Sequence, residues 1–141
     1  MVRMAPTTEL SAATLYAILR LRSEVFVVEQ ACPYLDPDGR DLESGCVQLW
    51  VQADDGTITA TARLLVETEG YRIGRVCTAP ASRSAGLGAD LVHAAIAKAG
   101  DGPIILDAQS QLADWYATFG FVPTGREFVE DDIPHTEMRR S

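Results

Sequence analysis

The sequence has 141 residues, the length of one domain, and its 20 acidic against 12 basic residues give a formal net charge of −8 at pH 7. This excess of negative charge disfavours nucleic acid and anionic membranes as partners and favours a cationic or neutral small substrate. A hydrophobic content of 47% and a charged content of 23% are ordinary for a chain that buries a core. We therefore expect a single domain over residues 1–141.

The cysteines and the hydrophobic segments exclude several other classes. Cys32, Cys46 and Cys77 lie far apart and form no Cys-x-x-Cys pair, so we expect neither a disulfide framework nor a metal site. No segment has the form of a secretory signal or the length of a membrane span. These features predict a cytoplasmic protein.

The N-terminal part of the chain predicts a strand, a helix and a loop. Residues 2–9 are typical of a short strand, and Ser11 can cap a helix from about Ala12 to Phe26. Arg22 interrupts the apolar stripe of this helix, and the valines after it predict a change to extended chain. Residues 32–41 hold two prolines, an Asp-Gly pair and three aspartates, which is typical of a loop.

An antiparallel meander is predicted for residues 47–78. Residues 47–53 alternate apolar and polar side chains, which indicates a half-buried strand. Asp55-Gly56 predicts a hairpin turn into a return strand over residues 58–66. Glu69-Gly70 then turns the chain into a third strand, residues 71–78.

The stretch Thr78–Ala89 joins this third strand to a helix that starts near Leu87. Gly86 and Gly88 allow the main chain to approach a ligand closely, and Arg83 supplies a forked donor suited to phosphate. The unpaired N–H groups of a first helical turn also favour an anion. We therefore expect a phosphate-bearing cofactor here; a solvated loop before an ordinary helix is the alternative.

Two familiar phosphate loops fit this stretch less well. A Walker A loop needs Gly-Lys-Ser/Thr, whereas Gly88 is followed by Ala89 and Asp90. A dinucleotide-binding fingerprint needs a third glycine where Leu91 stands. Asp107 does lie at the spacing of the ribose-binding acid of that fingerprint, so a dinucleotide-binding loop stays the second interpretation of this stretch.

The C-terminal part predicts one more strand, a helix and a closing hairpin. Residues 103–108 form a buried apolar run, and Ser110 can cap a helix that Gly120 stops. Residues 121–129 and 134–138 are typical of two strands around an acidic turn. The whole pattern predicts an α/β (α+β) fold, with a mixed, mainly antiparallel sheet of about six to seven strands flanked by helices.

Several motifs together resemble the GNAT superfamily of N-acetyltransferases. Residues 83–88, Arg-Ser-Ala-Gly-Leu-Gly, resemble its Arg/Gln-x-x-Gly-x-Gly/Ala pyrophosphate loop, and Thr78-x-Pro80-x-x-Arg83 resembles the segment that precedes that loop. Tyr116-x-x-x-Gly120-Phe121 resembles the segment after the fifth strand. Further blocks resemble the ElaA-type family: residues 15–30, Cys32-Pro33-Tyr34, residues 38–42, residues 73–76, Asp107-Ala108-Gln109 and Ile133-Pro134-His135.

This resemblance implies a GNAT acyltransferase fold that binds acetyl-CoA in a V-shaped opening between the fourth and fifth strands. The implied acetyl-CoA-binding residues are Val76, Cys77, Thr78, Arg83, Ser84, Ala85, Gly86, Leu87, Gly88, Ala89, Gln109 and Tyr116. Many superfamily members carry asparagine where this chain has Gln109, so how the pantetheine arm is held there stays open.

Acetyl transfer needs a polarised carbonyl, a base for the amine and an acid for the departing thiolate. Main-chain N–H groups around residues 76–78 can polarise the carbonyl. Tyr116 is the candidate acid, because a phenol stays protonated at neutral pH and can donate to a thiolate. Its place on the apolar stripe of a helix also fits a purely structural role.

The base and the acceptor site are less defined by the sequence. Glu29, at a predicted helix end, and His135, next to a closing strand, are the candidate bases. An exposed carboxylate and a structural histidine are the respective alternatives. Asp36 and Asp38, together with Glu29, are candidates for binding a cationic amine, and a solvated acidic loop is the alternative.

Two functions of different classes follow. The first is an acetyl-CoA-dependent N-acetyltransferase that acts by direct attack of a primary amine, supplied by a small molecule or a protein amino group. The second is a non-catalytic sensor that binds acyl-CoA or another nucleotide. The sequence leaves the acceptor undefined and both a monomer and a homodimer open.

Overall fold

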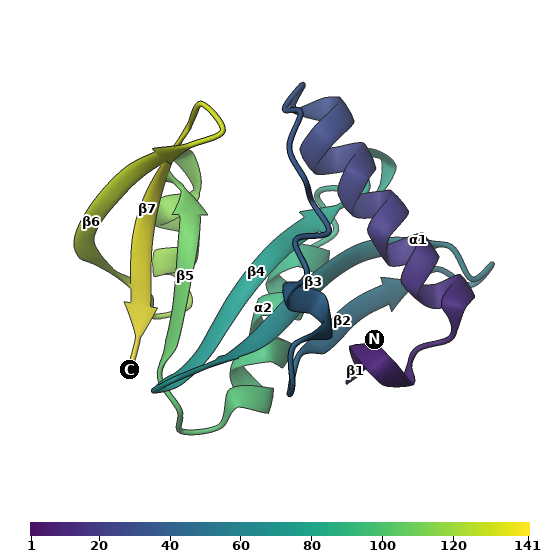
Figure 1. Cartoon of the computed structure of the whole chain (residues 1–141), viewed down its shortest axis with the longest axis horizontal. Coiled ribbons are helices and arrows are strands. Elements are labelled where there is room, and N and C mark those ends of the chain that lie inside the picture. Colours follow the sequence, from purple (N-terminus) through teal and green to yellow (C-terminus); the bar gives the residue numbers. More distant parts are fainter.

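Seven strands form one mixed sheet with helices on both faces, in a computed structural model that describes residues 1–141 (Figure 1). The elements are β1 Val2–Pro6, α1 Ala12–Arg22, β2 Val47–Gln52, β3 Ile58–Glu67, β4 Gly70–Thr78, α2 Leu87–Ala99, β5 Ile104–Gln109, α3 Ala113–Ala117, β6 Val122–Glu130 and β7 Ile133–Arg140. The strand order is β1-β2-β3-β4-β5-β7-β6, and every neighbouring pair is antiparallel except β4 and β5. The predicted fold class is therefore confirmed.

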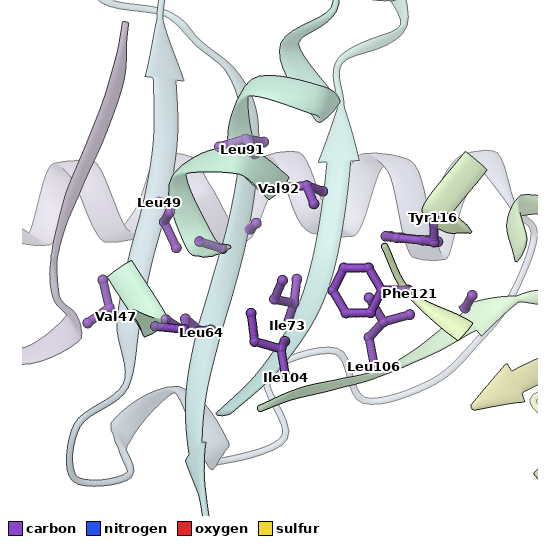
Figure 2. Close-up of a cluster of buried hydrophobic side chains, with 14 of the residues drawn as sticks. Val47, Leu49, Leu64, Ile73, Leu91, Val92, Ile104, Leu106, Tyr116 and Phe121 are labelled. Carbon is purple, nitrogen blue, oxygen red and sulfur yellow. The ribbon is translucent and has the colours of Figure 1, made fainter. Parts of the chain in front are cut away.

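The central strands are buried on both faces, which corrects the half-buried strand predicted for residues 47–53. Leu49 belongs to the larger core cluster with Leu91 and Val92 of α2, as the close-up in Figure 2 shows. Trp50, on the opposite face of β2, packs with Ile18 of α1 in a second cluster. Polar residues between the apolar ones predicted an exposed face, but α1 covers that face.

The N-terminal helical stretch runs further than predicted. Ser11 caps it as expected, since its hydroxyl accepts a hydrogen bond from the N–H of Thr14 at 3.1 Å. The α-helix ends at Arg22, and a π-helical segment, Ser23–Glu29, continues past Phe26, where extended chain was predicted. The wider turns appear in bonds that span five residues, such as the one from the N–H of Cys32 to the carbonyl of Val27 at 3.0 Å.

Strands β4 and β5 pair only at their beginnings. Tyr71 and Arg72 pair with Ile104 and Ile105, and beyond these residues the two parallel strands diverge (Figure 1). The edge of β4 that faces β5 therefore has no strand partner after Arg72. This divergence is the V-shaped opening that the resemblance implied.

A β-bulge interrupts β4 inside the opening. Thr61 of β3 is opposite Cys77 and Arg63 is opposite Gly74, so two residues of β4, Arg75 and Val76, face a single residue of β3. Arg75 has a φ of 54°, in the left-handed region that residues with a Cβ seldom adopt. The bulge changes the local direction of the β4 edge that borders the opening.

The C-terminal elements differ from prediction in two details. Ser110 does not cap a helix: it starts a 3-10 turn, its hydroxyl is 3.0 Å from that of Thr136, and α3 begins only at Ala113. The closing strands β6 and β7 are confirmed, and Asp131 and Asp132 form their turn with φ values of 52° and 63°.

Candidate functional site

A cavity of about 430 Å³ occupies the opening between β4 and β5. Its walls come from the π-helical segment, the loop after it, the bulged part of β4, β5, α3 and the β6–β7 turn. Eight of the predicted site residues line it: Asp38, Val76, Cys77, Thr78, Arg83, Gln109, Tyr116 and His135. Glu29, Asp36 and residues 84–89 do not line this cavity.

The start of α2 has the geometry of an anion site. Ser84 and Gly86 adopt left-handed φ values of 72° and 77°, which turn the chain into the helix. The first intrahelical bond runs from the N–H of Asp90 to the carbonyl of Gly86, at 3.1 Å. The N–H groups of Leu87, Gly88 and Ala89 therefore have no partner within the helix and carry its positive dipole end.

The two glycines of this loop have different surroundings. A Cβ at Gly86 would meet no atom within 4 Å, so this residue faces open space. A Cβ at Gly88 would lie 3.4 Å from the Trp115 ring, because the start of α2 packs against α3. Open space on one side and close packing on the other fit a loop that holds a phosphate-bearing group.

Arg83 and Glu29 form a two-pronged ion pair. The guanidinium donates from Nη1 to Glu29 Oε2 at 2.7 Å and from Nη2 to Oε1, while Nε donates to the carbonyl of Thr78 at 3.2 Å. The hydrogen bonds from Arg83 hold the pKa of Glu29 below its usual value. Two residues that the sequence assigned to different roles, base and phosphate ligand, thus bind each other.

Tyr116 belongs to the core cluster and also lines the cavity. Its ring packs edge-on against Trp115, with centroids 4.8 Å apart, and lies near Phe121 at one end of the cluster (Figure 2). Burial raises the pKa of the Tyr116 hydroxyl to about 12. The packed ring therefore holds a protonated hydroxyl at the cavity. This position is compatible with the structural role and with the role of an acid.

His135 lies at the start of β7, opposite Gln109 of β5 in the sheet, and lines the cavity. Its Nδ1 is 2.7 Å from the carbonyl oxygen of Ile133, and since a carbonyl only accepts, Nδ1 carries the proton of the neutral ring. The ring stacks on Phe128, with centroids 5.4 Å apart and planes 11° apart. Nε2 is then the unprotonated nitrogen, and it makes no hydrogen bond within the protein.

Asp36 and Asp38 belong to a closed ring of alternating charges, called the charge ring below. Its six members in order are Arg22, Asp36, Arg75, Asp38, Arg63 and Asp41, and Asp41 returns to Arg22. The successive nitrogen–oxygen distances are 2.9, 2.9, 3.3, 2.8, 3.2 and 2.7 Å. Three positive and three negative charges make the ring neutral.

The charge ring changes the interpretation of the acidic loop. Asp36 is 1% exposed and contacts Arg22, Arg75 and the Tyr34 hydroxyl, so it is not free to meet an amine. Asp38 lines the cavity, but two hydrogen bonds from Arg63 hold the pKa of its carboxyl well below the usual range. The structure thus brings only Asp38 of the pair to the cavity wall.

Sequence reasoning missed the three arginines of the ring. Arg22 and Arg63 are 1% and 4% exposed, although arginine is almost never this buried without a charged partner. A signal existed for Arg22, which stands at an apolar position of the helix stripe. Gln48 carried no such signal, yet it is fully buried and donates to Asp41 at 2.9 Å.

No group of three or more His, Cys, Asp or Glu side chains is arranged to hold a metal ion. No helix is both long enough and apolar enough to span a bilayer.

The chain resembles known proteins over nearly its full length. The profile of a family described as "Acetyltransferase (GNAT) domain" matches residues 17–141. UPF0039 protein Rv2851c of Mycobacterium tuberculosis is 48% identical over 136 residues, which cover 94% of this chain and 87% of that protein. Protein ElaA of Escherichia coli is 39% identical over 140 residues, which cover 94% and 91%.

Solved structures superimpose closely. The crystal structure of Escherichia coli ElaA has a TM-score of 0.92 at 36% identity and covers 100% of this chain and 99% of that one. An acyl-CoA N-acyltransferase from Pseudomonas aeruginosa has a TM-score of 0.94 at 40% identity, with the same coverage.

Proposed function

Because the chain belongs to the GNAT acetyltransferase family, with ElaA among its relatives, we propose that it transfers an acetyl group from acetyl-CoA to a primary amine. The resemblance to the GNAT superfamily and its ElaA-type family is thereby confirmed. The observation that supports the proposed reaction is the cavity between β4 and β5, which both Tyr116 and His135 line.

The pyrophosphate of acetyl-CoA would lie at the start of α2. The N–H groups of Leu87, Gly88 and Ala89 have no partner within the helix and could donate to an anion there, and Arg83 would add a positive charge. Ser84, Ala85 and Gly86 complete the loop. The pantetheine arm would follow the unpaired edge of β4 toward Gln109 of β5.

The unpaired edge of β4 would also polarise the thioester carbonyl. Main-chain N–H groups near Val76, Cys77 and Thr78 border the cavity and are held by the strand. One fixed donor aimed at the charge that develops on a carbonyl oxygen is worth about 10²–10³ in rate.

The proton transfers would use His135 and Tyr116, which both line the cavity. The amine nitrogen attacks the carbonyl carbon, Nε2 of His135 accepts a proton from the amine, the carbon–sulfur bond breaks, and the Tyr116 hydroxyl donates its proton to the thiolate. Glu29 is the weaker candidate base, because its paired carboxylate with a lowered pKa has little tendency to take a proton.

Direct attack is favoured over a covalent acyl-enzyme. Two thiols that could take the acetyl group line the cavity, those of Cys32 and Cys77. Burial raises the pKa of both thiols, that of Cys77 to about 12, so both stay protonated at neutral pH, and the thiol form is a poor nucleophile.

The proposal is tested by incubating the protein with acetyl-CoA and a panel of primary amines, small molecules and lysine-containing peptides. Thiol release is followed together with mass spectrometry of each amine, and acetyl-CoA binding is measured by calorimetry. Detection of an acetylated amine would support the N-acetyltransferase function. Saturable acetyl-CoA binding without product from any amine supports the alternative, a non-catalytic acyl-CoA sensor.

A further inference from the structure

The bulge in β4 depends on a residue in an unfavourable backbone conformation. Arg75 has a left-handed φ of 54° and lies two residues before Cys77, on the edge that borders the cavity. A residue with a Cβ holds such a conformation only when its surroundings fix it. The contacts of the Arg75 side chain therefore bear on the shape of this edge.

Those contacts come almost entirely from the loop after the π-helical segment. The Arg75 Nη2 donates to the carbonyl of Asp36 at 3.2 Å and to Asp38 Oδ2 at 3.3 Å. The Nε is 2.9 Å from Asp36 Oδ1, and the Tyr34 ring lies 5.4 Å from the guanidinium carbon. The side chain is thus held between two carboxylates and an aromatic face.

The two carboxylates are themselves anchored on regular elements. Asp36 receives a hydrogen bond from Arg22 of α1 at 2.9 Å, and Asp38 receives two from Arg63 of β3, at 2.8 and 2.9 Å. Asp41 closes the charge ring by joining Arg22 to Arg63. The ring therefore connects the bulge to a helix and a neighbouring strand through ion pairs that are buried at Arg22 and Asp36 and partly exposed at Arg75 and Asp38.

We propose that the charge ring positions the bulged edge of β4 for catalysis, with Arg75 as the positioning residue and Asp36 as its principal anchor. The inference rests on the proposed function, in which N–H groups of residues 76–78 meet the thioester carbonyl. A donor displaced by about 1 Å costs on the order of 10² in rate, so a device that fixes this edge contributes to kcat.

Asp36 offers a clean test, because it touches Arg75 but does not line the cavity. Asp36→Asn keeps the shape of the side chain, removes its charge and leaves the amino-acid sequence of β4 unchanged. The expected result is a kcat lowered about tenfold or more for every amine that reacts, with KM for acetyl-CoA and amine within about twofold. Amide hydrogen exchange at Val76 and Cys77 is expected to accelerate about tenfold in the unliganded protein.

The matched control is Glu137→Gln. Glu137 pairs with Arg126 at 3.2 Å on the β6–β7 hairpin, and it neither lines the cavity nor belongs to the ring. The same carboxylate-to-amide change there is expected to leave kcat and the exchange of Val76 and Cys77 at wild-type values. Tyr34→Phe removes the hydrogen bond from the Tyr34 hydroxyl to Asp36. It is expected to lower kcat and to accelerate amide exchange at Val76 and Cys77, as Asp36→Asn does. It takes the place of Asp36→Asn in the test if that variant does not fold.

Three results would overturn the inference. Unchanged exchange at Val76 and Cys77 in Asp36→Asn would mean that the ring does not hold the bulge. A kcat per folded molecule equal to wild type would give the ring a role in stability alone. A selective rise in KM for the amine would make Asp36 part of the acceptor site. If the wild-type protein acetylates no amine, the proposed function fails, and the exchange measurement still decides whether the ring fixes the bulge.

Discussion

Glu29 and Arg83 bind each other through two hydrogen bonds that join the end of the π-helical segment to the loop before α2. They are 54 residues apart in sequence, and about two fifths of each side chain is exposed. In the proposed mechanism Arg83 meets the pyrophosphate of acetyl-CoA. The carboxylate of Glu29 and the phosphate then compete for one guanidinium.

This competition gives a prediction for Glu29→Gln. Removing the carboxylate frees Arg83, so Kd for acetyl-CoA is expected to fall about two- to fivefold, the range set by an exposed ion pair. Arg83→Gln, the matched change on the partner, is expected to raise Kd. Isothermal titration calorimetry measures both. A Glu29→Gln variant with unchanged Kd and a kcat lowered more than about 100-fold would instead identify Glu29 as the base.

Tyr116→Phe separates the catalytic from the structural role of the ring. The phenyl ring keeps the packing against Trp115 and Phe121, so Tm is expected to stay close to wild type. The loss of the acid is expected to lower kcat about 10²-fold or more at an unchanged Kd for acetyl-CoA. Full activity in this variant would make Tyr116 a core residue only.

The raised pKa of Tyr116 predicts the alkaline part of the pH profile. A pKa of about 12 keeps the hydroxyl protonated up to about pH 11, so kcat in the wild type is expected to show no alkaline loss due to this group below that pH. Steady-state kinetics from pH 7 to pH 10, with the folded fraction followed by circular dichroism, measures this. A fall of kcat near pH 9 that is absent in Tyr116→Phe would contradict it.

His135→Asn removes the proposed base and keeps a polar side chain of similar size. The variant is expected to have a kcat about 10²-fold below wild type, because no side chain is left to take the proton of the amine, while Kd for acetyl-CoA stays close to wild type. His93, on α2 and outside the cavity lining, is the control histidine, and the same change there is expected to leave kcat at the wild-type value. A kcat of His135→Asn equal to wild type would exclude His135 as the base.

Gly86→Ala tests the loop at the start of α2. The new Cβ meets no protein atom within 4 Å, but the left-handed φ costs about 1–2 kcal/mol of stability. Gly125→Ala on β6 is the matched control, since Gly125 also has a positive φ, 98°, and open space around it. Both variants are expected to lose similar stability in denaturant titrations. Only Gly86→Ala is expected to weaken acetyl-CoA binding, by about tenfold or more, since its Cβ occupies the space of the phosphate.

Asp41→Asn tests the charge ring by stability. Asp41 is almost buried between Arg22 and Arg63, and removing one partner of a buried pair costs about 3–5 kcal/mol. Burial raises its pKa, but the hydrogen bonds and charge of Arg22 outweigh this, so the pKa is lowered on folding. The carboxylate therefore contributes fully above about pH 4 and less as the pH falls through the folded-state pKa. The difference in unfolding free energy between wild type and variant is expected to shrink from pH 7 to pH 3. A constant difference would contradict it.

The sequence predicted those parts of the fold that depend on local patterns. Ser11, the hairpin turn at Asp55-Gly56 and the glycine loop at Gly86 act through their immediate neighbours, so their effect is visible in a short window. The π-helical segment was missed because valine favours extended chain, whereas Val25 is buried in the second core cluster, a tertiary contact that a short window of sequence does not show. Burial of β2 on both faces depends on α1, which the alternation in β2 alone does not reveal.

Only the part of the candidate site that depends on local motifs was predicted from the sequence. The loop and Tyr116 carry motif signals, whereas the charge ring joins residues up to 53 positions apart, Arg22 and Arg75 at its extremes. Charged residues in a sequence suggest solvent exposure unless their partners are known. Asp36 and Asp38 were therefore assigned to the acceptor, although they pair with the buried Arg22 and Arg63.

The most direct test of the account is a crystal structure of the protein with bound coenzyme A. We expect the pyrophosphate to accept hydrogen bonds from the N–H groups of residues 87–89. We expect the sulfur to lie between the diverging ends of β4 and β5, within hydrogen-bond reach of the Tyr116 hydroxyl. A coenzyme bound elsewhere, or a sulfur that lies away from this hydroxyl with Tyr116 closed off by its aromatic neighbours, would contradict it.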